Sequence, residues 1–419
     1  MAQPQTQYEI RALNALAFPK GRQPRCELTG LPATVECETP HITLYYATRE
    51  HAEQAWHGIM NKIAPLLGPL RASAVVVGSE EDRAKRDYTL NMSKRALIDL
   101  CQQEASKFLV AGRYELAIPG AIQAISFLKD IHGDGAMEMV PPYLQLAEAN
   151  LGLGRFQQAE EFLSLANWSV LKNPDCSNAI RSQLHRNFGK LYSAKGKLDE
   201  ALQELAKDIY CSSLEVGPEH VDTSAGYYHM ASIFYTQHRI ENALAFYDKV
   251  VDIWYKFLAS VRNDTELAES LSESQLQEGM DMLNFILQTR MKLLGQGHIA
   301  TGEAKYTLGL LYLFMGDKKM AHDCISTACE IYTKHLGPEH PSTRDVLEVL
   351  KHLNKSASVF AGRDDGGTPA VPGESGGADE FGDIGGHFPK EMPRAATQSP
   401  IPMPPGERAE RAEAEGRRT

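Results

Sequence analysis

From about residue 90 to residue 358, apolar residues recur at the three- and four-residue spacing of amphipathic helices, interrupted only by short polar breaks. A small residue marks every second helix at steps of 42 residues, at Ala117, Ala159, Ala201 and Ala243. The position five residues before this marker holds Gly112, Gly154, Gly196 and His238. The spacing therefore predicts pairs of helices joined by a tight turn and repeated along the chain.

The first helix of each pair has its own pattern. A small residue stands where the two backbones would approach, at Ala105, Ala147, Gly189 and Ala231. An aromatic residue follows at Phe108, Tyr192 and Phe234, and Asn150 departs from this rule. The pattern returns around Gly309 and Ala321, 78 residues after Ala243. That interval leaves room for one degenerate pair within Asp264–Leu294, with Gly279, Leu283 and Ile286 at the corresponding places.

This pattern resembles the tetratricopeptide repeat, whose standard unit has about 34 residues. The longer step resembles the lengthened repeat of kinesin light chains, in which a Gly-Pro-x-His segment joins the units. Here that segment is Gly217–His220 before Thr223 and Gly337–His340 before Thr343, with a weaker copy at Gly295–His298. Its Gly and Pro are expected to end one helix, and Ser or Thr to cap the next. The resemblance implies an all-α fold, a right-handed superhelix of tetratricopeptide repeats.

The predicted domain order follows from these boundaries. A lead-in occupies residues 1–25, a small module with a helix 26–70, and a linker 71–89. The repeat array occupies 90–358, with about six units of which the fifth is degenerate, and a capping helix at 342–358. Residues 359–419 are rich in Gly, Pro and charge, so they are predicted to be disordered.

Residues 26–64 resemble a MYND zinc finger that has lost ligands. The family's ligand pairs fall here on Cys26/Thr29, Cys37/Pro40, Ala47/His51 and Met60/Ala64, with Tyr46 and Trp56 at the family's aromatic positions. The interleaved arrangement of the family implies that Cys26 and His51 remain at one site and Cys37 at the other. A structural zinc needs four ligands, so no zinc or other cofactor is expected. Packing is expected to replace the metal, through Leu31, Val35, Leu44, Trp56 and Ile59.

Composition narrows the function classes. The net charge of −11 argues against a general binder of nucleic acid. No apolar run approaches the roughly 20 residues of a membrane span, and the start lacks the features of a signal peptide. The seven cysteines are mostly far apart, which suits a reducing compartment. No set of acid, base and nucleophile accompanies the histidines, so we expect a soluble intracellular protein that is not an enzyme.

Candidate binding residues lie on the first helices of the repeats, at positions expected to face the concave side of the array. They are Gln102, Glu148, Arg186, Lys190, Tyr228, Ser232 and Tyr235. Arg181, Arg186 and Lys190 could form a positive patch for an acidic partner or a solvated face. Tyr228 and Tyr235 could anchor a partner or pack between repeats.

The order of finger and array, with several local segments, resembles the family of MYND-finger-containing tetratricopeptide proteins of motile cilia. The segments are Ala15–Gly21, Asp175–Ala179, Leu184–Asn187, Asp208–Tyr210, Asp222–Ser224 and Tyr227–Tyr235. The resemblance implies a non-catalytic subunit of the ciliary axoneme that attaches or stabilises an inner dynein arm. Its implied partners are an inner-arm dynein heavy chain and a second tetratricopeptide protein. The alternative is a soluble cytoplasmic adaptor, either an assembly factor for dynein arms or a kinesin-light-chain-like cargo receptor.

Overall fold

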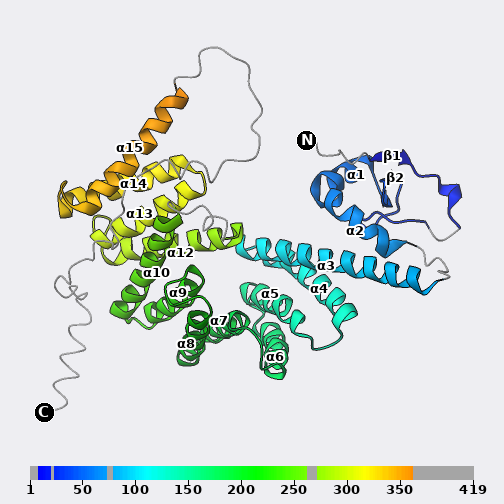
Figure 1. Ribbon diagram of the computed structural model, residues 1–419, viewed down its shortest axis with the longest axis horizontal. Helices are drawn as coiled ribbons and strands as arrows, with labels where there is room; N and C mark the ends of the chain where they lie inside the picture. Colours follow the sequence, from blue (N-terminus) through cyan, green and yellow to red (C-terminus); the bar gives the residue numbers. More distant parts are fainter. Residues whose placement is uncertain (1–7, 20–22, 73–78, 262–270, 362–419) are drawn as a thin grey trace. The chain divides into compact units, whose positions relative to one another are not determined.

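The structure is a computed structural model that describes residues 8–19, 23–72, 79–261 and 271–361 (Figure 1). The chain divides into two compact units, Met1–Cys211 and Ser212–Thr419, and the division falls within helix α8 (Leu198–Glu215). The first unit holds a small mixed module and three helical pairs. The second unit holds the remaining helices.

The N-terminal module contains a three-stranded antiparallel sheet in the order β1 (Glu9–Ala12), β2 (Val35–Glu38) and β3 (Thr43–Tyr46). Ile10 lies opposite Cys37, which lies opposite Leu44. Two helices follow, α1 (Arg49–Ala55) and α2 (Asn61–Arg71), joined by a π-helical turn at Trp56–Met60. The prediction of a separate lead-in is wrong, because β1 pairs with β2. The repeats are all-α as predicted, and the small module that precedes them contains the sheet.

The module's core differs in part from the predicted packing. Leu44 is fully buried, and Trp56 is buried and stacks on Tyr8 with ring centroids 4.6 Å apart. Leu31 is 57% exposed and Ile59 37% exposed, so neither can replace a metal's stabilisation. Ile59 follows Gly58, where the backbone leaves helical geometry. The core of the module also holds Cys26, Cys37, Tyr46, Ala52 and Ala55.

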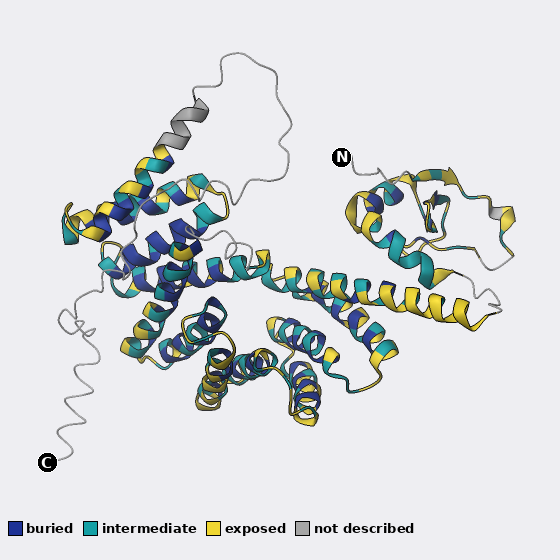
Figure 2. Ribbon diagram, viewed as in Figure 1, coloured by how far each residue is buried: buried dark blue, intermediate teal, exposed yellow. Residues whose placement is uncertain are grey.

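Part of the predicted linker is helical. Helix α3 (Glu80–Val110) begins ten residues before the predicted array, and the Ser79 side chain accepts a hydrogen bond from the Asp82 N–H as its N-cap. The acidic run at 80–82 lies in the first turn, where negative charge complements the helix dipole. Figure 2 shows that this N-terminal part of α3 is mostly exposed, which explains why the sequence there lacks an apolar stripe.

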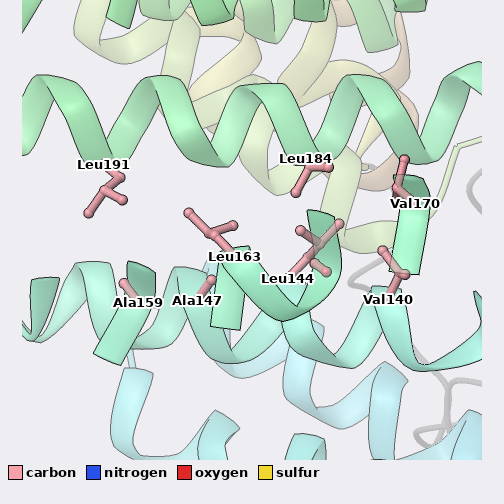
Figure 3. Close-up of a cluster of buried hydrophobic side chains, with 9 residues drawn as sticks. Val140, Leu144, Ala147, Ala159, Leu163, Val170, Leu184 and Leu191 are labelled. Carbon is pink, nitrogen blue, oxygen red and sulfur yellow. The ribbon is translucent and has the colours of Figure 1, made fainter. Parts of the chain in front are cut away.

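Three helical pairs complete the first unit. They are α3 with α4 (Tyr114–His132), α5 (Val140–Gly152) with α6 (Phe156–Lys172), and α7 (Asn178–Ala194) with α8. A short 3₁₀ turn at Met137–Met139 precedes α5. Figure 3 shows Leu184 and Leu191 of α7 pointing toward Leu144 of α5 and Leu163 of α6. Neighbouring pairs therefore share one core, as expected for units that cannot bury their apolar stripes alone.

The tight turns confirm the predicted period. Gly112, Gly154, Gly196, His238 and Gly316 all have a positive φ, between 58° and 84°. At each turn the next residue donates its N–H to the carbonyl five residues before it, and these carbonyls belong to Phe108, Asn150, Tyr192, Phe234 and Tyr312. Glycine adopts this left-handed conformation without strain, so His238 is the exception among the turns.

The second unit begins with α9 (Val221–Thr236) and α10 (Ile240–Val261). After the gap in the described residues come α12 (Glu273–Leu293), α13 (Ile299–Phe314), α14 (Lys318–Leu336) and α15 (Pro341–Ala361). The buried residues of α12 include Gly279, Leu283 and Ile286. The residues 42 positions later, on α14, are Ala321, Ile325 and Ala328, and they are buried as well. Helix α12 is therefore the second helix of the degenerate pair. The start of that predicted pair and the predicted disorder after 361 lie outside the described residues.

The inter-repeat loops correct one prediction. The Nδ1 atoms of His220, His298 and His340 accept hydrogen bonds from the backbone N–H two residues later, each at 3.2 Å. The histidine of the loop motif is thus the residue that caps the following helix, in place of the predicted Ser or Thr. Thr223 and Thr301 instead donate their hydroxyls back to the carbonyls of Gly217 and Gly295. These histidines have a structural role.

Candidate functional site

Three first helices, α3, α5 and α7, carry the predicted groove residues of the first unit. Gln145 of α5 donates to the carbonyl of Gln102 and to the hydroxyl of Ser106, each at 2.9 Å. Between the next two first helices, Lys190 Nζ of α7 lies 2.8 Å from Glu148 Oε1 of α5. These contacts join α3 to α5 and α5 to α7. The structure thus brings predicted groove residues of successive repeats into one row.

Glu148 and Lys190 remain accessible at this row. Their side chains are 37% and 25% exposed. The Lys190 ammonium lowers the pKa of Glu148 through its charge and its hydrogen bond, and the Arg186 charge adds to this against the effect of burial. Glu148 is therefore ionised at neutral pH, and a partner would meet a paired carboxylate and ammonium.

Arg186 has a different role from the predicted one. Its guanidinium makes two hydrogen bonds to the fully buried carboxylate of Asp208 in α8, at 2.9 and 3.3 Å. Ser182 donates to the same carboxylate at 2.5 Å. Because Asp208 and Glu148 balance Arg186 and Lys190, these residues do not make a positive patch. Arg181 donates to the carbonyl of Pro174, at the loop before α7.

Tyr228, Ser232 and Tyr235 lie on α9 in the second unit. The Tyr228 ring lies 5.7 Å from Phe285 and 6.3 Å from Tyr247, measured between centroids. Burial raises the pKa of Tyr228 to about 12, with smaller contributions from Tyr247 and from nearby carboxylates. The Ser232 hydroxyl donates to the Tyr228 carbonyl, which fixes it within the helix. Tyr228 therefore packs against neighbouring helices while its side chain stays partly exposed.

The degenerate finger brings its remaining first-site residues together. Cys26 Sγ lies 3.9 Å from His51 Nδ1, as the interleaved arrangement of the family implied. Burial would raise the pKa of Cys26, but hydrogen bonds from the Thr29 hydroxyl and from backbone N–H groups of Ala47, Thr29 and Leu28 lower it to about 6. The loop thus still stabilises a thiolate, although only two donors remain.

The second site retains a single donor. Cys37 is 1% exposed, and burial raises the pKa of its thiol. Met60 and the buried Ala64 stand at two of the other positions. Within the described ranges, no three His, Cys, Asp or Glu residues group as a metal site would require. The donor sets therefore do not fit the four ligands of a structural zinc.

Sequence reasoning missed a buried polar cluster in the second unit. Arg290 of α12 is fully buried, bonds the Ala300 carbonyl at 2.5 Å and pairs with Asp248. Glu303 of α13 is 8% exposed, and burial raises its pKa to about 8 even though the Arg290 charge lowers it. The sequence signal for Arg290 was its polarity at a position that Trp254 and Tyr332 occupy in the neighbouring repeats. Among the helices that the structure describes, none is long and apolar enough to cross a membrane.

Comparisons with known proteins agree with this fold. A tetratricopeptide repeat family matches residues 302–335, which cover α13 and most of α14. Clustered mitochondria protein homologs are 25% identical over 179 residues in Debaryomyces hansenii and 22% identical over 233 residues in Emericella nidulans. These alignments cover 41% and 52% of this chain and 14% and 19% of the relatives. The chain therefore spans less than one-fifth of the length of these two relatives.

Solved structures align with this chain only at low TM-scores. A protein described as a kinesin light chain with nearly identical TPR-like repeats, from Podosopora anserina, aligns with a TM-score of 0.31 and 16% identity. The alignment covers 58% of this chain and 95% of that one. A Rap protein complexed with Competence and Sporulation Factor gives a TM-score of 0.30 at 12% identity, covering 63% and 72%. The family match and the regular helical pairs identify the repeats of this chain as tetratricopeptide repeats, a fold that scaffolds protein interactions.

Proposed function

We propose that this chain is a non-catalytic adaptor that binds protein segments through the first helices of its tetratricopeptide repeats and acts in the cytoplasm. The observation that carries the proposal is the row of partly exposed groove residues in the first unit, held in place by Gln145 and by the pair of Glu148 and Lys190. A groove that is already ordered loses little conformational entropy when a partner binds.

The relatives favour an adaptor over an axonemal subunit, because they carry the name clustered mitochondria protein. Cargo or organelle attachment, as in a kinesin-light-chain-like receptor, is therefore the finer form of the proposal. An axonemal scaffold for an inner dynein arm remains the second candidate, supported by the segments around Asp175–Asn187. Detergent extraction separates the two, since an adaptor leaves with the detergent-soluble fraction and an axonemal subunit stays until high salt.

A charge exchange tests the groove itself. The double variant Glu148→Lys with Lys190→Glu keeps an intramolecular ion pair but inverts the order of charges that a partner meets. The matched control exchanges Glu160 and Lys195, which pair at 2.7 Å across α6 and the turn after α7. Partners captured by the full chain should be lost from the first variant and kept by the second. Equal capture by both variants would show that this groove does not hold the partners.

A further inference from the structure

One face of α12 combines a half-buried and an exposed carboxylate, Glu278 and Asp281, with an exposed aromatic ring. Glu278, Asp281 and Phe285 follow one another at spacings of three and four residues, so they share a face of the helix. Phe285 is 42% exposed, and no other phenylalanine among the described residues is as exposed.

Tyr228 of α9 joins this face to a second ring. The Tyr228 and Phe285 rings meet edge to face, with their planes at 85°. Tyr247 lies behind them and is fully buried, and its hydroxyl has no hydrogen-bond partner among the described residues. The charges of Asp281 and Glu278 make small contributions to the raised pKa of Tyr228, which agrees with their place on the face of α12 that carries Phe285.

Glu278 and Asp281 differ in their ion pairing from two acidic residues of the first unit. Glu148 and Asp208 are each paired with a Lys or Arg side chain. In the described ranges no ion pair involves Glu278 or Asp281, and Asp281 accepts only a long hydrogen bond of 3.3 Å from Gln277 Nε2. Their negative charge is therefore available to an external cation.

The repeat itself does not require this chemistry. The residues 42 positions later, on α14, are Met320, Asp323 and Thr327 in place of Glu278, Asp281 and Phe285. An aromatic ring is therefore not needed at the last of these positions to pack the second helix of a pair. The combination of two carboxylates with an exposed ring is specific to α12.

We infer that Glu278, Asp281, Phe285 and Tyr228 form a docking site, the α12 site, for a basic segment of a partner protein. This inference rests on the proposed adaptor function and names the chemistry of one partner. An Arg or Lys side chain over the exposed part of the two rings gains a cation–π contact. The same cation pairs with the adjacent carboxylates, whose charge steers a basic segment toward the site.

Fluorescence anisotropy of the full chain tests the α12 site with a short labelled peptide rich in Arg and Leu. The matched peptide carries Glu in place of Arg. We expect the basic peptide to bind at least about tenfold more tightly, and its affinity to fall about tenfold in the Glu278→Gln/Asp281→Asn variant and in Phe285→Ala. The control variants Asp323→Asn and Thr327→Ala, at the matching positions of α14, should bind as the parent does.

Salt provides an independent readout. The parent's affinity for the basic peptide should fall between about 50 and about 200 mM salt, and less so in the doubly neutralised variant. Equal affinity for the two peptides, or equal losses in the α12 and α14 variants, would overturn the α12 site. Partner capture that survives both α12 variants would also overturn the α12 site, but it would leave the adaptor proposal standing. The charge exchange at Glu148 and Lys190 tests the adaptor proposal separately.

Discussion

Replacing Glu303 with Gln should stabilise the second unit above neutral pH and remove much of its pH dependence. The carboxyl is buried, and its Oε1 atom has no hydrogen-bond partner among the described residues. The Arg290 charge offsets this burial only in part, and its guanidinium bonds the Ala300 carbonyl and Asp248. The negative charges of Asp248 and Asp252 raise the pKa of Glu303 further.

The magnitude follows from the pKa of Glu303, which rises from 4.5 to about 8 on folding. Between these values the folded state holds a proton that the unfolded state releases, so the free energy of unfolding falls as the pH rises. The slope is about 1.4 kcal/mol per pH unit, or roughly 4–5 kcal/mol over the whole window. This contribution is complete below about pH 4.5 and lost as the pH passes about 8. Gln resembles the protonated carboxyl, so the variant should lack the slope.

Urea unfolding followed by the fluorescence of Trp254 measures this effect. Trp254 is buried in α10, and the other two tryptophans are removed by W56F and W168F so that only the second unit reports. The parent should lose stability from about pH 5 to about pH 8 relative to Glu303→Gln. Glu330→Gln, at an exposed position of α14, should follow the parent at every pH. A Glu303→Gln variant with the parent's pH dependence would refute the assignment of the titration to this carboxyl.

Four further substitutions test the packing of the repeats by urea denaturation. Gly279→Ala should cost about 1–3 kcal/mol, because its Cβ would lie 2.3 Å from the ring of Trp254. Gly196→Ala should cost about 1 kcal/mol from its φ of +75° alone, and His238→Gly should be neutral or stabilise by up to about 0.5 kcal/mol. Asp208→Asn should cost about 3 kcal/mol, because it leaves the Arg186 guanidinium without its buried carboxylate.

Controls for these substitutions come from the same chain. Gly297→Ala meets no atom within 4 Å and has no positive φ, so it should change stability little. Asp199→Asn removes an exposed carboxylate in the first turn of α8 and should cost less than about 1 kcal/mol. A Gly279→Ala variant as stable as Gly297→Ala would contradict the close packing of α12 on α10. A destabilised His238→Gly would show that the imidazole itself contributes to the turn.

The period of the apolar pattern predicted the repeats because each marker residue has one physical role. Gly196 and His238 occupy the same left-handed turn, and Gly189 lies where a Cβ would meet Leu205 at 2.7 Å. The finger resemblance similarly implied the proximity of Cys26 and His51, which the structure confirms. The turn and close-contact positions are set by the backbone, so small residues recur there at the same step, with His238 as an exception.

The pairing of charges could not be predicted in this way. The partner of Arg186 is on another helix, 22 residues along the chain, and spacing alone does not show that Asp208 points inward. The start of α3 was missed because its first turns are exposed and carry no apolar stripe. The strand β1 was missed because a short strand at the edge of a small sheet has little periodicity.

The break in the period explains where the α12 site lies. The marker advances 36 residues from Ala243 to Gly279, six fewer than elsewhere, and then 42 to Ala321. The shortened interval falls before α12, and α10 then packs directly against α13 as well as against α12. With α10 in contact with both, α12 lies near α9, where the rings of Phe285 and Tyr228 meet. If this shortening creates the site, restoring six residues between α10 and α12 should separate the two rings and abolish binding of the basic peptide. Retained binding in that variant would show that α12 alone forms the site.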